Sequence, residues 1–383
     1  MATPERKWQR KGFYEAMAFA RLADQPREGG GLRKRFMSLS PAWKPGRELP
    51  WDTLPQAISL SMKPMEPSAF GGHVYAQSAL VAGRAVEEGE QDLPAAAKRV
   101  IHVSFISCHV VNVDPKQSIQ GVFSNPGLID RPFVYEVSEI SSGRSFSTSQ
   151  VISRQPAAAS AKPLGPFPAS DADVPLSEIC FSCLVTFKRA FQGVSEVQTT
   201  PPQVRYAAVL ASRNPWEWMP SPQVDIDMLR DLFPNADHGA FPMLDMYKVD
   251  MSEINKDKPV LDRRELLLYK LLEPIPKEDI NAHIVCHAYE ADRNGLLMIG
   301  NQLGYGYNLG TAASLSYSFY VHVNGEQAVM DEGWWIQEVS FSRVSAGRAM
   351  LETKIWSPTG LHVASGYQDG IITPRRGAKS EKL

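Results

Sequence analysis

The chain has 383 residues, of which 43% are hydrophobic and 21% are charged, and its formal net charge is −2. This composition supports a full hydrophobic core in one large or two ordinary domains, and it excludes a disordered chain. The near-neutral charge argues against nucleic-acid binding but leaves room for a local basic patch that meets an anionic ligand.

Four cysteines are too few for a disulfide framework at this length, so we expect a reduced, intracellular protein. Cys180 and Cys183 form one CxxC pair without a second pair, and the histidines show no ligand spacing. We therefore expect ordinary half-buried cysteines, no metal and no cofactor.

Targeting signals are weak. No stretch approaches the ~20 apolar residues of a transmembrane helix, and residues 1–12 lack the apolar segment of a signal peptide. We therefore expect a cytoplasmic protein without a membrane span. The C-terminal Glu381-Lys382-Leu383 matches a peroxisomal SKL-type signal only in its last two residues, which leaves the peroxisome as the alternative.

The first half predicts a strand, a helix and four further strands. Residues 1–50 are basic and broken by glycine, so we expect an extension in which residues 33–35 (Arg33, Lys34 and Arg35) form a solvated cluster. Apolar spacing and turn signals delimit the elements that follow. These are a strand at 57–62, a helix at 73–87 and strands at 100–111, 117–123, 132–140 and 144–153, in a domain that spans 51–155.

The middle of the chain has a different composition. Residues 156–175 are rich in Pro, Ala and Ser, which predicts a linker. Residues 177–191 can form a helix, and the remainder has no clear architecture. We interpret 156–260 as a linker and an insertion that either packs on the core or forms a lid over a cleft.

The second half repeats the pattern of the first. A Glu-Val-Ser tripeptide at 136–138 recurs at 338–340, which supports an internal repeat. The expected elements are a strand at 265–272, a helix at 278–300 and strands near 313–323, 333–343, 348–356 and 361–372, in a domain at 261–374 followed by a tail at 375–383. The sequence predicts an α+β fold of two tandem βαββββ units, each with a long helix wrapped by an antiparallel sheet. Joining the two sheets edge to edge would remove an exposed strand edge.

One carboxylate stands out in the second predicted helix. Ile284, Ala288, Asp292 and Leu296 follow each other at i, i+4 spacing, which places Asp292 on an apolar face. A carboxylate there must find partners or shift its pKa. The alternative is an aspartate that only caps the helix or forms a salt bridge.

Several segments resemble the acyl-CoA thioesterase II family. They are FGGHVYAQSAL (70–80), the run from VIHVSFIS to RPFVYEVSEISSGRSFS, and the C-terminal AYEAD, ASLSYSFYVH and GLHVASGYQDG. The resemblance covers roughly 65–155 and 260–372 and implies a double hotdog fold. It also implies an acyl-CoA hydrolase of fatty acid metabolism whose water nucleophile is held by an aspartate, a hydroxyl residue and a glutamine. By position these are Asp292, Ser314 and Gln368. The family often has an acidic residue and a histidine where this chain has Ser316 and Tyr317.

These residue types suit thioester hydrolysis. An aspartate on an apolar face has a raised pKa and can act as a general base. A glutamine and a serine can both accept and donate hydrogen bonds, so they can orient a water molecule. We expect backbone N–H groups at the N-terminal end of the second helix to stabilise the oxyanion. We also expect a homo-oligomer, by resemblance.

Further residues are expected around the substrate. Gln77 lies in the apolar face of the first helix and is a candidate counterpart of Asp292, which would leave one active site per chain. Tyr305, Tyr307 and Trp334 are candidates to line an apolar acyl channel, and core packing is the alternative role for each. The CoA phosphates would meet basic residues, chosen from Arg33, Lys34, Arg35, Arg375 and Arg376.

Two other functions stay open. The first is a non-hydrolytic hotdog protein that binds or cyclises an acyl or polyketide-like intermediate. The second is a hydratase, which would need an Asp–His pair and for which His287 near Asp292 is the candidate. A covalent serine mechanism is disfavoured because the sequence has no GxSxG motif.

Overall fold

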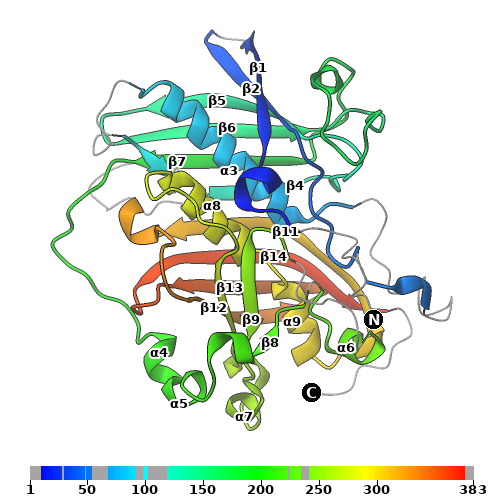
Figure 1. Cartoon of the computed structure of the whole chain (residues 1–383), viewed down its shortest axis with the longest axis vertical. Coiled ribbons are helices and arrows are strands. Elements are labelled where there is room, and N and C mark those ends of the chain that lie inside the picture. Colours follow the sequence, from blue (N-terminus) through cyan, green and yellow to red (C-terminus); the bar gives the residue numbers. More distant parts are fainter. Residues whose placement is uncertain are drawn as a thin grey trace, which may run out of the picture.

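The computed structural model describes residues 10–27, 30–47, 49–53, 68–91, 98–101, 119–222, 224–233 and 241–375. The strand predicted at 57–62 and most of the strand predicted at 100–111 lie outside these ranges. The described residues form an α+β fold dominated by one large antiparallel sheet (Figure 1). No helix among them is long and apolar enough to cross a membrane.

The sheet contains fourteen strands from the described part of the chain. Their bounds are β1 (Phe19–Pro26), β2 (Leu32–Ser38), β3 (Val100–Ile101), β4 (Ile119–Phe123), β5 (Val134–Ser142), β6 (Phe146–Arg154), β7 (Phe181–Lys188), β8 (Met219–Pro220), β9 (Leu244–Lys248), β10 (Glu265–Leu271), β11 (Leu309–Val321), β12 (Trp335–Ser345), β13 (Arg348–Trp356) and β14 (His362–Pro374). Thirteen of them follow the order β1-β2-β5-β6-β7-β4-β11-β14-β13-β12-β10-β9-β8, and β3 pairs with β7.

The helices are fewer. They are α1 (Phe13–Ala16), α3 (Gly71–Glu88), α4 (Pro202–Arg205), α5 (Ala207–Leu210), α6 (Asp227–Leu232), α7 (Ser252–Asn255), α8 (Ile280–Ala291) and α9 (Gly295–Gln302), with short 3-10 helices at Trp51–Thr53, Ala169–Ala172, Pro215–Glu217, Val260–Asp262, Gly306–Asn308 and Gly325–Ala328. Figure 1 shows α3 lying across the first-half strands, with α8 packed against it. Most of α3 and α8 is buried, as expected of helices enclosed between a sheet and another helix.

The two halves of the chain meet where β4 pairs with β11. Outward from this joint, the first half places β7, β6, β5, β2 and β1 in order, and the second half places β14, β13, β12, β10 and β9. The repeated Glu-Val-Ser tripeptide occupies equivalent places. Glu136 on β5 lies opposite a residue of β2, and Glu338 on β12 lies opposite a residue of β10. The two halves therefore arrange their strands in the same order about the joint.

Two segments belong to the sheet although the sequence suggested otherwise. Residues 177–191 were expected to be helical, but they contain β7, because Phe181, Cys183, Val185 and Phe187 alternate toward the core with the period of a strand. The expected N-terminal extension contributes β1 and β2. The first-half sheet therefore extends beyond the boundaries 51–155 on both sides.

The expected solvated cluster at residues 33–35 lies on β2 and is paired. Arg33 forms an ion pair of 3.3 Å with Glu136, and Lys34 forms one of 3.0 Å with Glu88. The cluster is therefore part of the sheet's packing against β5 and α3, and the prediction of a purely solvated group is wrong.

The helix predicted over 278–300 is interrupted. Helix α8 ends at Ala291, and α9 begins at Gly295 after a turn in which Asn294 has a φ of 56°. Asparagine tolerates this left-handed conformation better than most residues. A Cβ on Gly295 would lie 2.7 Å from a methyl group of the buried Leu351 side chain, so glycine lets the turn pack closely against β13. Asp292 therefore lies at the C-terminal end of α8, and its side chain is not in the middle of a continuous helix.

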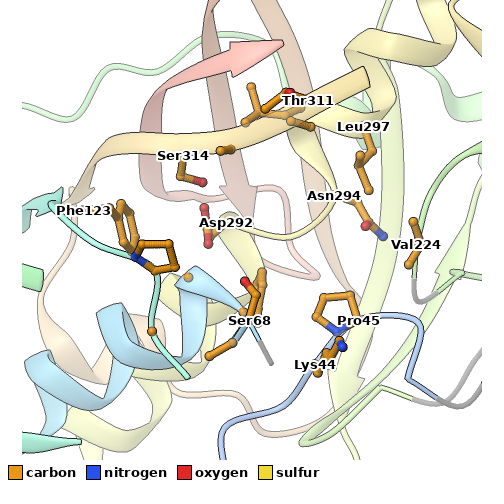
Figure 2. Close-up of a pocket in the computed structure, with 18 of the residues that line it drawn as sticks. Lys44, Pro45, Ser68, Phe123, Val224, Asp292, Asn294, Leu297, Thr311 and Ser314 are labelled. Atoms are coloured by element: carbon orange, nitrogen blue, oxygen red, sulfur yellow. The ribbon is translucent and has the colours of Figure 1, made fainter. Parts of the chain in front are cut away.

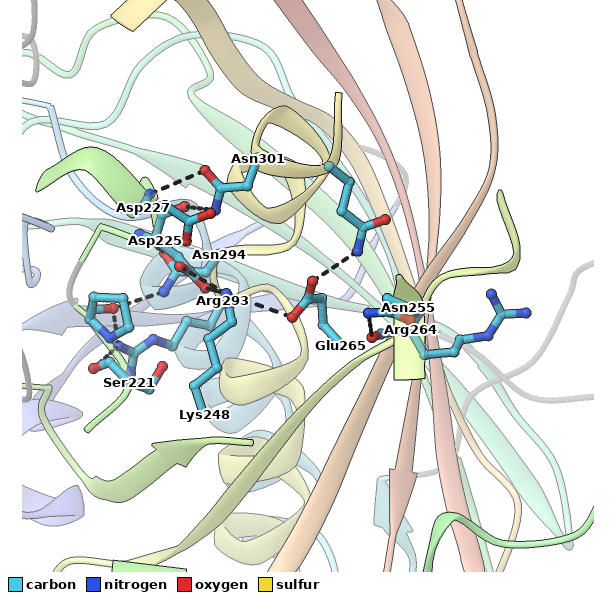
Figure 3. Close-up of polar contacts among 12 residues, drawn as sticks. Ser221, Asp225, Asp227, Lys248, Asn255, Arg264, Glu265, Arg293, Asn294 and Asn301 are labelled. Carbon is cyan, nitrogen blue, oxygen red and sulfur yellow. Dashed lines mark hydrogen bonds and ion pairs between the residues drawn. The ribbon is translucent and has the colours of Figure 1, made fainter. Parts of the chain in front are cut away.

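The middle segment packs on the core (Figure 3). Asn294 Nδ2 donates to the Pro222 carbonyl at 2.9 Å, and Asn301 Nδ2 donates to the Asp225 carbonyl at 2.8 Å. The buried Asp225 carboxylate forms an ion pair of 2.9 Å with Lys248 on β9. Within the insertion expected at 176–260, these bonds hold Pro222 against the turn at Asn294 and Asp225 against α9.

Candidate active site

The three residues predicted to hold the catalytic water come together in space. Gln368 Nε2 donates one hydrogen bond of 2.6 Å to Asp292 Oδ1 and another of 2.7 Å to Ser314 Oγ. Asp292 caps α8, Ser314 lies on β11 and Gln368 lies on β14. One amide group therefore joins side chains from three elements.

A β-bulge aims Ser314 at this site. Along β11, Phe319 and Tyr317 face the core opposite Gly366 and Gln368 of β14. The register shifts between residues 314 and 316, so that Ser314 pairs with Gly370, which is also an inward-facing position. Without the extra residue, strict alternation would place residue 315 on the inner face. The bulge is therefore what brings the hydroxyl to Gln368.

Asp292 lies against the N-terminus of the first-half helix. Its carboxylate accepts hydrogen bonds from the Gly72 N–H and the Ser314 hydroxyl, both of which lower its pKa. Burial has the larger effect and raises the pKa from 3.8 to about 7. A Cβ on Gly72 would lie 3.1 Å from Asp292 Oδ2 and 2.5 Å from the Phe70 ring. Glycine at position 72 therefore permits this close approach.

The residue after Asp292 fixes the turn between α8 and α9. Arg293 is 1% exposed, and its guanidinium donates to the Ser221 and Pro222 carbonyls at 3.2 and 2.6 Å (Figure 3). The guanidinium also lies 3.6 Å from the centre of the Phe241 ring. Burial lowers the pKa of Arg293 to about 10, so it remains charged at neutral pH. The middle segment thus supports the main chain that carries Asp292.

A cavity of about 750 Å³ opens beside these side chains, and both halves of the chain line it (Figure 2). Its size is typical of a small-molecule site. The first half and the N-terminal segment contribute Lys44, Pro45, Ser68, Ala69, Phe70, Gly71, Val74, Phe123, Ser124, Asn125, Pro126, Gly127, Phe133 and Cys180, and the rest of the chain contributes Val224, Ile226, Asp292, Asn294, Gly295, Leu296, Leu297, Gly306, Leu309, Gly310, Thr311, Ala312, Ala313, Ser314, Gln368 and Arg375.

The predicted substrate-binding residues mostly lie elsewhere. Gln77 is fully buried, accepts a 2.6 Å hydrogen bond from the Tyr135 hydroxyl and donates to the Met17 carbonyl, so it ties α3 to its own half. Trp334, just before β12, packs on Tyr247 of β9. Tyr305 packs against the core. None of the three lines the cavity, and the side chain of Tyr307 lies outside the described part of the structure.

The basic residues expected to meet the CoA phosphates also lie in different places. Arg375 lines the cavity, whereas residues 33–35 are on β2, and Arg376 lies outside the described residues. Lys44 also lines the cavity, and sequence reasoning missed it because nothing in its local pattern distinguishes it from other lysines. Sequence reasoning also missed Gly71, which lines the cavity, and Gly72, whose N–H reaches Asp292, although the FGG motif that contains them was visible.

His287 is not directed at Asp292. Its Nε2 bonds to the Ala328 carbonyl at 2.9 Å, and its Nδ1 bonds to the Tyr269 hydroxyl at 2.8 Å. Because a carbonyl only accepts, Nε2 carries the proton and Nδ1 accepts from the tyrosine. Burial lowers the pKa of this histidine to about 3, so it is neutral. The Asp–His pair expected of a hydratase is therefore not formed by Asp292 and His287.

Three of the cysteines lie in the described part of the chain. Cys180, Cys183 and Cys286 are free and buried. Burial raises the pKa of Cys180 to about 12, so its thiol stays protonated. Among the residues that the structure describes, no three His, Cys, Asp or Glu side chains cluster in a way that could hold a metal ion.

Comparison with solved structures places this fold among known ones. The acyl-CoA thioesterase II TesB2 from Mycobacterium marinum matches with a TM-score of 0.57 and 19% identity, over 96% of this chain and 100% of that one. The tesB protein of Mycobacterium avium subspecies paratuberculosis matches with a TM-score of 0.53 and 16% identity, over 94% and 98%. This chain shares the fold of these thioesterase structures. No protein-family model matches the sequence, and the search of curated proteins found no match.

Proposed function

We propose that the protein hydrolyses an acyl-CoA thioester to a free acid and CoA, using a water molecule held by Asp292, Ser314 and Gln368. The convergence of these three side chains beside a cavity carries the proposal. The architecture that we propose is a tandem double hotdog, in which the two half-sheets join through β4 and β11. The likeness in fold to TesB-type thioesterases supports both statements.

Asp292 is the proposed general base. With a pKa of about 7, it is partly ionised at neutral pH and close to the optimum for proton transfer. A water molecule that binds to Asp292 beside Ser314 gives a proton to the carboxylate while its oxygen attacks the thioester carbonyl carbon. The C–S bond then breaks, and CoA leaves as the thiolate. Because Gln368 donates to both Asp292 and Ser314, it holds the two groups in a fixed relation around that water.

The oxyanion donors that we propose come from the first half. The first N–H groups of a helix have no partner within the helix, and the N-terminus carries partial positive charge. Gly71 begins α3 and lines the cavity, while the next N–H, that of Gly72, already reaches Asp292. Backbone N–H groups at the N-terminal end of α8, expected from the sequence as oxyanion donors, do not suit this geometry, because Asp292 lies at the opposite end of α8. The Gly71 N–H is the better candidate.

The charged part of the substrate would lie at the side of the cavity that Lys44 and Arg375 line. Their positive charge suits the phosphates of CoA, which are stable only where they stay solvated or paired.

The test is release of free thiol from acyl-CoAs of different chain length. Asp292→Asn should lower the rate by about 10² to 10⁴-fold, because a positioned base contributes that much. Glu290→Gln is the matched control. Glu290 is a fully buried carboxylate on the same helix with a pKa raised to about 8 by burial, yet it does not line the cavity.

Two outcomes would overturn the proposal. If Asp292→Asn hydrolyses acyl-CoA at the parent rate, Asp292 is not the base. If the wild-type protein releases no thiol from any acyl-CoA, the non-hydrolytic alternative, binding or cyclisation of an acyl or polyketide-like intermediate, takes its place.

A further inference from the structure

Two consecutive side chains after Asp292 bind the same distant piece of main chain (Figure 3). The Arg293 guanidinium donates to the Ser221 and Pro222 carbonyls, and Asn294 Nδ2 also donates to the Pro222 carbonyl. Pro222 lies 71 and 72 positions before these two donors in the chain. The main chain just beyond the proposed base is therefore held from outside its own helix.

The groups that hold Arg293 are uncharged. Its hydrogen bonds go to the two main-chain carbonyls and to the Met246 sulfur, and its guanidinium lies over the Phe241 ring. Buried arginines are usually paired with a carboxylate, because a buried charge without partners is costly. The nearby Glu290 has a pKa raised to about 8 by burial, and among the described residues its side-chain oxygens have no hydrogen-bond partner. The fork of the guanidinium, and not an ion pair, therefore fixes Arg293 in place.

The segment that binds this turn is itself fixed to the second half. The Ser221 N–H donates to the Met246 carbonyl on β9 at 3.0 Å. The fully buried Asp225 carboxylate pairs with Lys248 on the same strand. Neither contact involves residues 292–294, so the segment provides a fixed support against which the turn is held.

The position of the Asp292 carboxylate depends on this turn. Helix α8 ends at Ala291, so the helix does not continue past Asp292 to hold its main chain, and Asn294 has the left-handed φ of 56°. On its other side the carboxylate contacts the Gly72 N–H and the Gln368 amide, which belong to α3 and β14. A displacement of about 1 Å would break these bonds. Misplacing a reacting group by that much can cost about 10²-fold in rate.

We propose that Arg293 is a positioning residue for Asp292: by binding the middle segment, it keeps the carboxylate within reach of Gly72 and Gln368. The main chain of residues 221 and 222 then helps to set the rate, although it acts only through Arg293. This inference rests on the proposed function, in which Asp292 is the general base.

The first experiment replaces Arg293 in two ways. Arg293→Lys keeps the positive charge but loses the fork that reaches two carbonyls, and Arg293→Met removes the charge while keeping an unbranched side chain. Both should lower kcat about 10²-fold in thiol-release assays, while KM for acyl-CoA changes less than about twofold.

A milder variant keeps the test decisive if the Arg293 variants do not fold. Glycine tolerates a φ of 56°, so Asn294→Gly preserves the turn and removes only the side chain that binds Pro222. It should lower kcat about tenfold. It is then judged by the same criteria as the Arg293 variants.

Hydrogen exchange of the Gly72 amide gives a measurement that needs no hydrolysis. The first N–H groups of a helix have no acceptor within that helix, so the protection of this amide comes from Asp292. In the Arg293 variants, NMR should show this amide exchanging at least about tenfold faster. Amides in the middle of α3 should keep their protection.

Arg205→Lys is the matched control. Arg205 on α4 also joins the middle segment to the sheet, through a hydrogen bond of 2.7 Å to Glu338 on β12, but neither residue lines the cavity. The same substitution there should change kcat by less than about twofold and leave the exchange of the Gly72 amide unaltered.

The outcomes separate this inference from the proposed function. If the wild-type protein hydrolyses no acyl-CoA, the proposed function fails, and the exchange of the Gly72 amide alone decides the role of Arg293. Folded Arg293 variants that keep the parent kcat and a protected Gly72 amide, or that change only KM, would overturn the inference. It is also wrong if Arg293→Lys keeps the parent rate and Arg293→Met does not, because the charge would then matter and not the fork. A fall in kcat with Gly72 still protected would likewise refute it, because Arg293 would then act without moving Asp292.

Discussion

Because the pKa of Asp292 is raised, we predict that the free energy of unfolding depends on pH, as does the activity. Burial raises its pKa from 3.8 to about 7, and hydrogen bonds from Gly72 and Ser314 offset this only in part. In the unfolded chain the group titrates near its ordinary value. Between those two pKa values the folded state holds a proton that the unfolded state has lost. Stability from this residue is therefore greatest at low pH and falls as pH rises toward 7 and beyond.

The magnitude follows from the pKa difference. Above pH 7 the ionised carboxylate destabilises the fold by about 4 kcal/mol relative to an unperturbed aspartate, and about 2–3 kcal/mol of that loss falls between pH 5 and pH 8. Asp292→Asn resembles the protonated acid and does not titrate. We expect the stability of this variant, relative to wild type, to rise by about 2–3 kcal/mol from pH 5 to pH 8.

The assay is urea unfolding of both proteins at several pH values. Taking the difference between them removes the contribution of other titrating groups, such as Glu290, whose raised pKa acts in the same direction. In parallel, wild-type kcat/KM should rise with pH through about 7, because the base must be ionised. A stability difference that is constant from pH 5 to pH 8, with a flat rate profile, would refute the assignment of a buried, functional carboxylate at position 292.

Three further substitutions test the surroundings of the site. Gln368→Leu removes the donor to the buried carboxylate and should lower kcat/KM about 10²-fold in thiol-release assays, since misplacing a reacting group costs that much; an unchanged rate would show that the amide is dispensable. Gly72→Ala places a Cβ 3.1 Å from Asp292 Oδ2 and should reduce kcat. Circular dichroism should show that the variant keeps its fold. Gly83→Ala, on the same helix but away from the cavity, is its control. Tyr269→Phe leaves His287 Nδ1 without its donor and should cost about 1–3 kcal/mol in urea unfolding; a collapse of kcat with normal stability would mean that His287 takes part in the reaction.

The local sequence signals were sufficient for much of the second half. The strands predicted at 265–272, 348–356 and 361–372 match β10, β13 and β14 to within about two residues, because alternating apolar positions and turn residues are local properties. The choice of Asp292, Ser314 and Gln368 as site residues rested mostly on the resemblance to the acyl-CoA thioesterase II family. Their catalytic roles remain predictions for the experiments above.

Local patterns specify the type of most periodic elements and the order of the two halves, although they misassign the strand β7. Which side chains share a site follows from tertiary packing alone. A single bulge residue turns Ser314 inward, and strand parity cannot reveal a bulge in advance. The backbone N–H of Gly72 reaches Asp292 although the two residues are 220 positions apart in the chain. The side chain of Gln77 was the site candidate on the same helix, but it bonds to Tyr135 within its own half. Such contacts depend on packing between distant segments, and a local pattern carries no information about which segments will meet.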